Sequence, residues 1–370
     1  MDSILLVTDP VDDSFSVQYE FIISLGKILK NQFDVYVFST YFPEKKARDL
    51  ETMGIKVIRG RNNFKINALL KPFGKKNESM LWIESWFREA FLKKNTKEIQ
   101  DLVKFDYTVN LSTTIPVKSN LWWIQGRSFY FTLKDLEMTS RLVRFGLLLF
   151  GGSIRRRDKL LLEKISQCSK KMVTNAKYLA LFYSGLGYSI DDVIYTAKNF
   201  DKFNPSENSK KDYVLTYIGK ETDFQPIIEM SKRGIKIKGF GTKVPIGISL
   251  SDIKKHIDYL GYVSDSDLSN LYSNALFTAF PFIEEPFGYI PIESMACGTP
   301  VLAYNKQGPA ETIIDEKTGW LISSDKEFVE RALKIWKNGH QLRKEDCIER
   351  AKAFTSEKTA EKLLNVLKKS

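Results

Sequence analysis

The chain has 370 residues, of which 43% are hydrophobic and 27% charged, the composition of an ordinary folded protein. Because one hydrophobic core rarely serves so many residues, we expect two domains. The net charge of +11 is compatible with nucleic acid, an anionic membrane or a phosphorylated ligand, so charge alone does not select a partner. The three cysteines lie far apart and show no metal-ligand spacing with the two histidines, which argues against a disulfide framework and against a Cys/His zinc site.

The N-terminal sequence MDSILLVTDPVDD enters a strand-like run and lacks the basic segment of a signal peptide. The sequence contains no run of eighteen apolar residues of the kind that spans a membrane. We therefore expect a cytoplasmic protein. The first strand is ILLVT at 4–8, and the helix after it has an apolar face made of Val17, Phe21, Leu25 and Ile28.

Apolar, β-rich runs then alternate with amphipathic stretches, the pattern of parallel sheets with crossover helices. In the first half we expect further strands at 34–40, 55–59, 107–112, 121–125 and 171–175. Residues 193–214 pass from a short strand into a segment rich in Asn, Pro, Ser and Lys, which marks a linker. A second series of strands follows at 213–219, 235–241, 257–263, 275–280, 300–304 and 319–323. The sequence therefore predicts an α/β protein of two doubly wound domains that meet across a cleft.

Two segments of the first half combine basic and apolar residues. Within 140–165, an apolar run at 145–150 is bracketed by Arg141, Arg144, Arg155, Arg156 and Arg157. This arrangement suits a surface lying among lipid headgroups, so we expect contact with an anionic membrane. Within 69–99, apolar residues recur at helical spacing among lysines, which is equally typical of a helix with one face in the core: Leu81, Trp82, Trp86, Phe87 and Phe91.

Known nucleotide fingerprints are not matched. SGLGYSID at 184–191 lacks the third glycine of a dinucleotide-binding loop and is interpreted as a helix end. YIGKET at 217–222 lacks the upstream glycine and the Ser/Thr of a P-loop. The basic residues are also unaccompanied by any groove-reading or base-stacking motif, so nucleic-acid binding is disfavoured.

The most informative stretch is EEPFGYIPIESMACGTPVLAYNKQGPAETI at 284–313, which follows a buried strand. We expect a helix from near Gly288 to near Gly298, whose N-terminal amides and partial positive charge can receive a diphosphate. Glu293, about one and a half turns into that helix, can accept two hydrogen bonds from a ribose. Glu285 precedes the helix, where a transferred sugar would lie. In this interpretation the two carboxylates bracket a nucleotide-sugar lengthwise, although an arbitrary pair of glutamates at this spacing is more typical of solvated helix and loop charges.

This stretch resembles the E-x7-E signature of retaining glycosyltransferases of the GT-B fold, in particular glycosyltransferase family 4 (glycosyl transferases group 1). Glu285 and Glu293 are the two glutamates of the signature, and the likeness extends through GPAETI and TGWLI over about forty residues. The resemblance implies two Rossmann-like domains facing a cleft. We assign 1–205 to an N-terminal acceptor-binding domain, 206–353 to a C-terminal nucleotide-sugar-binding domain, and 354–370 to a C-terminal helix that packs back on the first domain.

The resemblance also implies roles for single residues. Glu285, Lys220 and Gln125 are expected at the reaction centre, where Lys220 replaces the family's usual arginine and Gln125 replaces a histidine. The lysine expected five residues after Lys220 is missing, because Gln225 stands there, and Lys232 or Lys238 could compensate. The donor-binding residues are expected to be Glu293, Gly219, Phe287, Gly288, Tyr289, Ile290, Gly239 and Gly241.

The predicted function is a retaining, metal-independent hexosyltransferase that needs no cofactor besides its UDP- or GDP-linked sugar donor. We expect its acceptor to be a lipid-linked glycan or glycolipid, and the protein to lie peripherally on the inner face of the cell membrane. Two alternatives remain open: a soluble transferase acting on a sugar or sugar phosphate, and a non-catalytic scaffold that binds sugar nucleotides or glycans.

Overall fold

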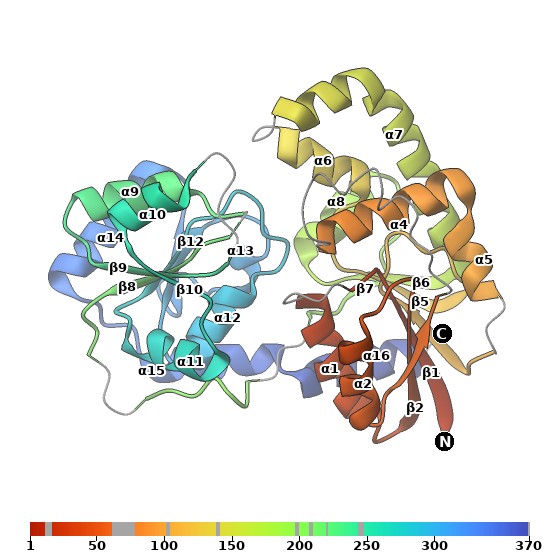
Figure 1. The fold of residues 1–370 in the computed structure, drawn as a ribbon. Helices are drawn as coiled ribbons and strands as arrows, with labels where there is room; N and C mark the ends of the chain where they lie inside the picture. Colours follow the sequence, from red (N-terminus) through yellow and green to blue (C-terminus); the bar gives the residue numbers. More distant parts are fainter. Residues whose placement is uncertain are drawn as a thin grey trace. The chain divides into compact units, whose positions relative to one another are not determined.

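The computed structural model describes residues 1–11, 17–60, 78–100, 104–137, 141–196, 200–206, 210–219, 221–242 and 248–368. The chain divides into two compact units (Figure 1). The first comprises residues 1–175, 179–197 and 356–370, and the second comprises 176–178 and 198–355. The chain therefore leaves the first unit at 197–198 and returns to it at 355–356, whereas the sequence suggested boundaries at 205–206 and 353–354.

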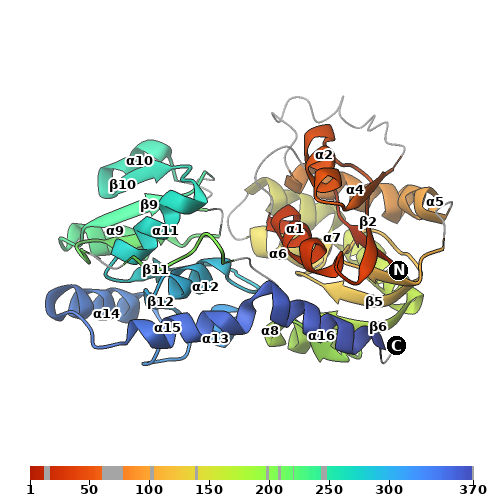
Figure 2. The ribbon, with the colours of Figure 1, turned by 90° about the horizontal axis from the view of Figure 1, so that it is seen from below.

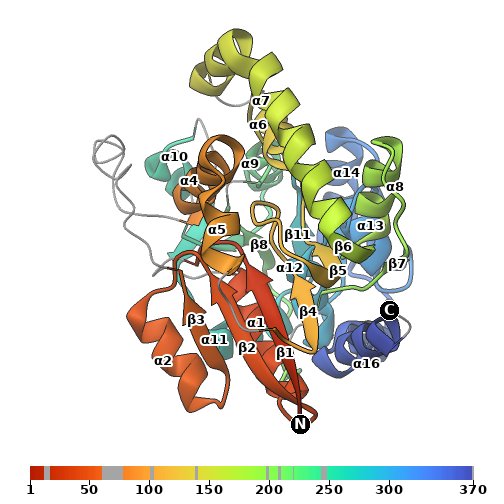
Figure 3. The same cartoon turned by 90° about the vertical axis from the view of Figure 1, so that its right-hand side faces the viewer.

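The first unit contains a seven-stranded parallel sheet in the order β3-β2-β1-β4-β5-β6-β7 (Figure 3). Strand β1 lies inside the sheet, between β2 and β4. Its residues from Ile4 onward are buried, as expected for a strand covered on both faces. The strands are β1 Asp2–Thr8, β2 Phe33–Ser39, β3 Lys56–Arg59, β4 Tyr107–Asn110, β5 Ser119–Ile124, β6 Ser169–Thr174 and β7 Asp192–Val193.

The helices associated with this sheet are α1 Val17–Leu29, α2 Glu44–Thr52, α4 Glu78–Leu92, α5 Lys94–Gln100, α6 Phe129–Glu137, α7 Arg141–Cys168, α8 Lys177–Gly185 and α16 Ser356–Lys368. Phe21 and Leu25, two residues of the apolar face expected for α1, are buried in the core. The helix expected to end at SGLG does so, because α8 ends at Gly185 and Gly187 has a φ of 93°.

The C-terminal helix α16 completes the core of the first unit (Figure 2). Leu363 and Leu367 are buried among side chains of α1 and of the sheet. Polar contacts fix the helix beside β6 and β7: Thr359 donates to the carbonyl of Tyr195 at 2.9 Å, and Lys362 pairs with Asp192 at 3.1 Å. The last residues of the chain thus stabilise the unit that its first residues begin.

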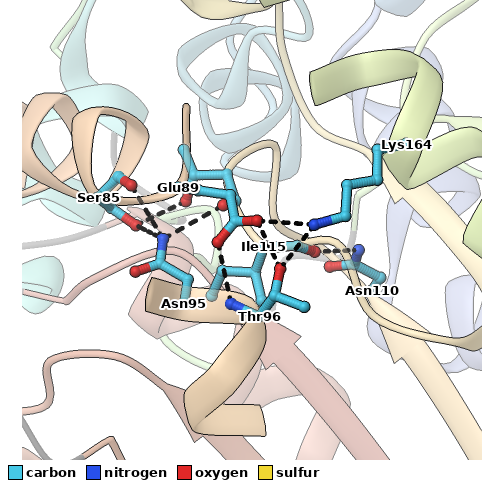
Figure 4. Close-up of polar contacts among 8 residues, drawn as sticks. Ser85, Glu89, Asn95, Thr96, Asn110, Ile115 and Lys164 are labelled. Atoms are coloured by element: carbon cyan, nitrogen blue, oxygen red, sulfur yellow. Dashed lines mark hydrogen bonds and ion pairs between the residues drawn. The ribbon is translucent and has the colours of Figure 1, made fainter. Parts of the chain in front are cut away.

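A buried polar cluster joins α4, α5 and the second half of α7 (Figure 4). The carboxylate of Glu89 on α4 accepts from Lys164 of α7 at 3.0 Å and from the backbone amide of Thr96 on α5 at 2.9 Å. The side-chain amide of Asn95 donates to the carbonyl and hydroxyl of Ser85, at 2.9 and 3.0 Å. Because these groups are paired with one another, they anchor α7 to the unit rather than forming an open site.

The first half of α7 extends beyond the rest of the first unit (Figures 1 and 3). Large apolar side chains are exposed on it: Phe145 is 61% exposed, Leu148 81%, Leu149 57% and Phe150 61%. In the described residues, no helix has both the length and the apolar character that crossing a bilayer requires. This half of α7 is therefore an exposed apolar element of a kind rarely found on a monomer surface without a partner.

The second unit contains a six-stranded parallel sheet in the order β10-β9-β8-β11-β12-β13. Helices α9, α10 and α14 cover one side of it, and α11, α12 and α15 cover the other (Figure 1). The strands are β8 Val214–Tyr217, β9 Ile237–Phe240, β10 Asp258–Gly261, β11 Thr278–Phe280, β12 Val301–Tyr304 and β13 Gly319–Ile322. The helices are α9 Phe224–Lys232, α10 Leu250–His256, α11 Asp265–Asn274, α12 Tyr289–Ala296, α13 Pro309–Thr312, α14 Asp325–Asn338, α15 Lys344–Ala351 and a 3₁₀ turn at Lys352–Phe354.

Numbered within each unit, both sheets place their first six strands in the order 3-2-1-4-5-6. That order defines the Rossmann-like doubly wound fold, in which the direction of winding reverses between the first and fourth strands. The predicted α/β class and the two Rossmann-like domains are thereby confirmed. The reversal points lie between β1 and β4 and between β8 and β11, and such points are where open parallel sheets bind ligands at the carboxyl ends of their strands.

Candidate active site

The winding of the second sheet reverses between β8 and β11. The loops that follow the carboxyl ends of these two strands support Glu285 and Glu293. The loop after β8 and the loop after β11 are tied together, because the amide of Ile283 donates to the carbonyl of Glu221 at 2.7 Å and the amide of Asp223 donates to that of Pro281 at 3.0 Å. Asp223 then caps α9 by accepting from the amide of Gln225. The loops after β8 and β11 therefore form one connected surface, here called the ledge. It lies at the position where this fold binds ligands.

Helix α12 starts where the sequence predicted it. Gly288 precedes it with a φ of 92°, a backbone conformation that favours glycine, and Pro291 sits in the first turn, where no amide hydrogen is needed. The helix ends at Ala296, and Gly298, which follows the C-cap residue, has a φ of 76° and an amide that donates to the carbonyl of Met295 at 2.9 Å. Glycine at both ends therefore fixes an eight-residue helix with its N-terminus at the ledge.

The carboxylate of Glu285 lies at the N-terminus of α12. Its Oε1 atom accepts from the amide of Gly288 at 2.9 Å and from that of Phe287 at 3.2 Å. The backbone of Glu285 is held as well: its amide donates to Oε1 of Gln307 at 2.6 Å, and its carbonyl accepts from Gly308 at 3.1 Å. In this conformation the Gly288 amide, predicted to receive a diphosphate, is bonded to Glu285 instead.

Burial and, secondly, the nearby charge of Glu221 raise the pKa of Glu285 to about 7, while the hydrogen bonds from the two amides oppose the rise. Burial is also the main cause that raises the pKa of Tyr217, followed by the charges of Glu221 and Glu285. Tyr217, Glu221 and Glu285 therefore form one cluster at the carboxyl end of β8, in which two carboxylates repel each other.

Glu293 lies on the buried side of α12 and is only 5% exposed. Its Oε2 atom accepts from the hydroxyl of Tyr272 on α11 at 3.0 Å. Tyr272 is fully buried, and burial together with the charge of Glu293 raises its pKa well above the ordinary value. Tyr272 therefore donates its proton to a hydrogen bond that fixes the carboxylate of Glu293 in one orientation.

Besides Gly288, three glycines were predicted to bind the donor, and they have different surroundings. A Cβ atom on Gly219 would lie 2.3 Å from the ring of Tyr217, and one on Gly241 would lie 2.1 Å from the carbonyl oxygen of Ile218, so both positions require glycine for close packing at the end of β8. Gly239 is buried within β9, and a Cβ there would meet Ile257 at 2.4 Å. Packing within the sheet already accounts for Gly239, and its role in donor binding stays a prediction.

The lysines that were expected to neutralise the diphosphate are less well positioned for that role. Lys220 lies outside the described residues. Lys232 is exposed in the last turn of α9, whose first turn is at the ledge, and Lys238 lies 4.3 Å above the ring of Tyr213 at the start of β8. Because α9 runs back from the carboxyl edge and Tyr213 precedes its strand, neither lysine is near the loops after β8 and β11.

Lys306 is a cation that the sequence analysis missed. Its ammonium group donates to the carbonyl of Ile283 at 3.2 Å and lies over the ring of Tyr304. It follows β12 and is exposed, so it can approach an anion at the ledge. Gln225, by contrast, is exposed in the first turn of α9 and carries no charge.

Gln125 lies in the first unit, directly after β5, and is partly buried. Its backbone carbonyl accepts from the side-chain amide of Asn175, the residue after β6, at 3.1 Å. The structure therefore associates Gln125 with Asn175, a residue that the sequence analysis did not select.

Among the described residues, no group of three or more His, Cys, Asp or Glu side chains is arranged to hold a metal ion. Asp12 and Asp13, the acidic pair of the first-domain loop, lie outside the described residues. Metal independence stays a prediction.

Comparisons with known proteins agree with the fold and the signature. Anabaena HepE, solved in complex with UDP-glucose, superposes with a TM-score of 0.66 over 99% of this chain and 100% of that chain, at 12% sequence identity. Sucrose-phosphate synthase from Thermosynechococcus elongatus superposes with a TM-score of 0.69 over 99% of this chain and 98% of that chain, at 15% identity. At such identities the likeness shows the fold alone, which is that of the GT-B glycosyltransferases.

Sequence comparisons match parts of the chain. Residues 248–354 match the family Glycosyl transferases group 1, which confirms the resemblance predicted from the E-x7-E stretch. A probable sucrose-phosphate synthase of Thermosipho melanesiensis is 36% identical over 115 residues, 30% of this chain and 27% of that protein. The mouse α-1,3/1,6-mannosyltransferase ALG2 is 35% identical over 75 residues, 20% of this chain and 18% of that protein. The chain thus matches about a quarter or less of the length of these curated relatives.

Proposed function

We propose that this chain is a retaining glycosyltransferase that moves a sugar from a nucleoside diphosphate to a hydroxyl of its acceptor. The observation that carries the proposal is the placement of Glu285 and Glu293 at the winding reversal of a Rossmann-like sheet, one at the N-terminus of α12 and the other within it. The match of residues 248–354 to the group 1 family and the fold shared with a protein solved with UDP-glucose support it.

The reaction depends more on positioning the donor and the acceptor than on a basic side chain of the protein. Glu293, oriented by Tyr272, is suited to accept from ribose hydroxyls. The N-terminus of α12, together with Lys306 and Lys220, can stabilise the negative charge that develops on the leaving diphosphate. In a retaining front-face reaction that diphosphate accepts the proton of the attacking hydroxyl. No metal is required by this arrangement, since the helix terminus and lysines supply the positive charge.

Turnover of nucleotide-sugars tests this assignment. The purified protein should slowly hydrolyse at least one donor in a panel that includes UDP-glucose and GDP-mannose. Glu285→Gln and Glu293→Gln should each reduce this rate ten- to hundredfold, because loss of one charged hydrogen-bond acceptor costs roughly 1.5 to 3 kcal/mol. Glu330→Gln, an exposed position on α14, is the matched control. Wild-type rates in both site variants would reject the proposal, and nucleotide-sugar binding without any turnover would favour the scaffold.

The acceptor that we propose is presented at an anionic membrane, with the protein bound peripherally on the cytoplasmic face. The exposed apolar half of α7 supports this, because Phe145 and Leu148 project from a helix that also carries Arg144, Arg155 and Arg156 on its exposed surface. Apolar residues flanked by arginines suit the interface between acyl chains and anionic headgroups.

The five arginines of this segment are not equivalent. Arg157 donates to the carbonyl of Ala90 at 2.9 Å and lies 3.9 Å above the ring of Phe91, so it joins α7 to α4. The side chain of Arg141 lies outside the described residues. Membrane attraction is therefore assigned to Arg144, Arg155 and Arg156, and Arg157 is a packing residue.

A soluble acceptor is the second candidate. The similarity of residues in the second unit to a probable sucrose-phosphate synthase favours it, whereas the similarity to ALG2 does not distinguish the two. The vesicle experiment described below for α7 separates the candidates, since a transferase with a soluble acceptor has no need of membrane contact.

A further inference from the structure

The amides at the N-terminus of α12 are occupied by a side chain of the protein itself. One oxygen of Glu285, Oε1, accepts hydrogen bonds from two successive backbone amides, those of Phe287 at 3.2 Å and of Gly288 at 2.9 Å. Two amides that converge on one point at a helix N-terminus are suited to receive one oxygen of a phosphate group. The carboxylate of Glu285 therefore lies where a phosphate oxygen would bind.

The backbone of Glu285 is fixed by the segment that follows β12. Its amide donates to Oε1 of Gln307 at 2.6 Å, and its carbonyl accepts from the amide of Gly308 at 3.1 Å. A Cβ atom on Gly308 would lie 2.3 Å from the carbonyl oxygen of Phe287, so the two segments are in direct contact. Because the backbone is held on both sides of its Cα atom, the side chain is the part of Glu285 that can turn without disturbing the loop.

The forces on the carboxylate of Glu285 allow its displacement. The two bonds that hold it come from neutral amides, and the neighbouring charge of Glu221 repels it. A diphosphate carries more negative charge than a carboxylate, so it interacts more strongly with the positive end of the helix dipole. An incoming diphosphate can therefore take the two amides from Glu285.

We propose that Glu285 is an internal competitor of the donor's diphosphate, an inference that rests on the proposed transferase function. In the free protein its carboxylate occupies the amides of Phe287 and Gly288. A diphosphate oxygen displaces the carboxylate, and the released side chain turns toward the transferred sugar. The measured affinity for nucleotide is then reduced in proportion to the fraction of molecules whose amides are free.

This competition has two consequences for the reaction. Glu285 is presented to the sugar only after the diphosphate is bound, so the reaction centre is completed by the correct donor. After transfer the sugar no longer holds Glu285, and its return to the amides favours release of the nucleoside diphosphate. The same side chain therefore opposes the binding of the free nucleotide and assists the sugar-bearing one.

Nucleotide binding to the full chain measures this competition. Calorimetry gives the dissociation constants of UDP and GDP, and of uridine and guanosine, which lack the phosphates. Glu285→Ala removes the competing carboxylate, and Glu285→Gln keeps its shape without its charge. Glu221→Gln is the matched control, since it removes a neighbouring negative charge and leaves the amides occupied. Hydrogen exchange followed by mass spectrometry reports the protection of the amides of Phe287 and Gly288, and thermal unfolding verifies that each variant is folded.

Glu285→Ala should bind UDP or GDP about five- to tenfold more tightly than the wild type, and Glu285→Gln should show a smaller gain. Affinity for the nucleosides should not change, and Glu221→Gln should tighten nucleotide binding less than Glu285→Ala does. Without nucleotide, exchange at Phe287 and Gly288 should be faster in Glu285→Ala than in the wild type, and nucleotide should slow it again. Donor hydrolysis should nevertheless fall in both Glu285 variants, so that tighter nucleotide binding accompanies slower turnover.

Equal or weaker nucleotide binding by folded Glu285 variants would overturn the inference. Equal tightening by Glu221→Gln would also overturn it, because general charge repulsion would then explain the effect. Unchanged exchange at Gly288 in Glu285→Ala would show that the carboxylate does not occupy the amide. Each of these results leaves the proposed function intact as long as a donor is hydrolysed. Failure of both the wild type and Glu285→Ala to bind either nucleotide would reject the proposed function and this inference with it.

Discussion

At the scale of single residues, the candidate site depends on groups that hold its two glutamates. Tyr272 orients Glu293, and Gln307 bonds the amide of Glu285. Glu221 places a like charge beside Glu285. The sequence contains a signature for the glutamates, but it contains none for these three partners, which come from other loops and helices. Their effects should be measurable one at a time.

The like charge of Glu221 should set the acid limb of the pH profile. Glu285 must be ionised to accept hydrogen bonds from sugar hydroxyls, and its pKa of about 7 predicts that kcat/KM for donor hydrolysis falls below that pH. Glu221→Gln removes the repulsion, so the limb should move to lower pH. Rates measured from pH 5 to 9 test this, and an unmoved limb in Glu221→Gln would contradict it.

The same shift has a consequence for stability. The pKa of Glu285 is raised on folding, so its ionised form disfavours the folded state. Stability should therefore decrease as pH rises from the ordinary carboxyl range to about 7, and Glu285→Gln should reduce this decrease in urea unfolding.

Gln307 has two opposing effects on the free energy of unfolding: its backbone conformation is strained, and its side chain makes a hydrogen bond that holds Glu285. Its φ is 52°, a conformation that costs a non-glycine residue about 1 kcal/mol, yet its side chain accepts from the amide of Glu285. Gln307→Gly loses the bond and relieves the strain, so its unfolding free energy should stay close to that of the wild type. Gln307→Ala loses the bond and keeps the strain, and should be about 1 kcal/mol less stable than the glycine variant. Equal stabilities of the two variants in urea unfolding would refute this account.

At the scale of elements, α7 has two halves with different surroundings. Its second half is anchored by Lys164, Arg157 and Asp158 to α4, and its first half exposes phenylalanine and leucine side chains.

The exposed half of α7 should control binding to anionic vesicles. Each arginine near such a surface contributes about 1 kcal/mol, so Arg144→Glu with Arg156→Glu should reduce co-sedimentation at least thirtyfold, and Leu148→Ser should reduce it further. Leu250→Ser, an exposed leucine of the second unit, should have no effect. Binding should also weaken as salt rises. A wild-type protein that ignores phosphatidylserine-containing vesicles at low salt would support the soluble acceptor.

At the scale of the whole molecule, the chain crosses between its two units and returns at α16. The first unit therefore needs residues from both ends of the chain for its core, whereas the second unit is built mainly from 198–355. Stability of the first unit should accordingly depend on a helix that follows the donor-binding region in sequence.

Truncation of Leu363 tests this dependence. Its side chain is fully buried against the first unit, so Leu363→Ala should lower the unfolding free energy by about 2 to 5 kcal/mol. Leu260→Ala, at a partly exposed position in the second unit, should have a much smaller effect. Urea unfolding followed by circular dichroism measures both, and an unchanged midpoint for Leu363→Ala would show that α16 is dispensable.

Metal removal tests the proposed charge compensation of the whole enzyme. Because we propose that the N-terminus of α12 and Lys306 stabilise a diphosphate without a cation, donor hydrolysis should persist in EDTA. The control is the same assay with added Mg²⁺, which should leave the rate within about twofold. Complete loss of hydrolysis in EDTA, restored by Mg²⁺, would contradict metal independence.

The sequence by itself determined the parallel strands, the helix between Gly288 and Gly298 and the resemblance to a family, because these features depend on local apolar periodicity, on glycines at helix ends and on one contiguous motif. Only the tertiary structure decided which side chains support Glu285 and Glu293, that Arg157 packs against Phe91 instead of facing outward, and that Asn175 stands beside Gln125. These pairings join residues that are 21 to 66 positions apart in the sequence. They arise because parallel strands and their helices bring distant segments together at one edge of a sheet, and no pattern of neighbouring residues records that meeting.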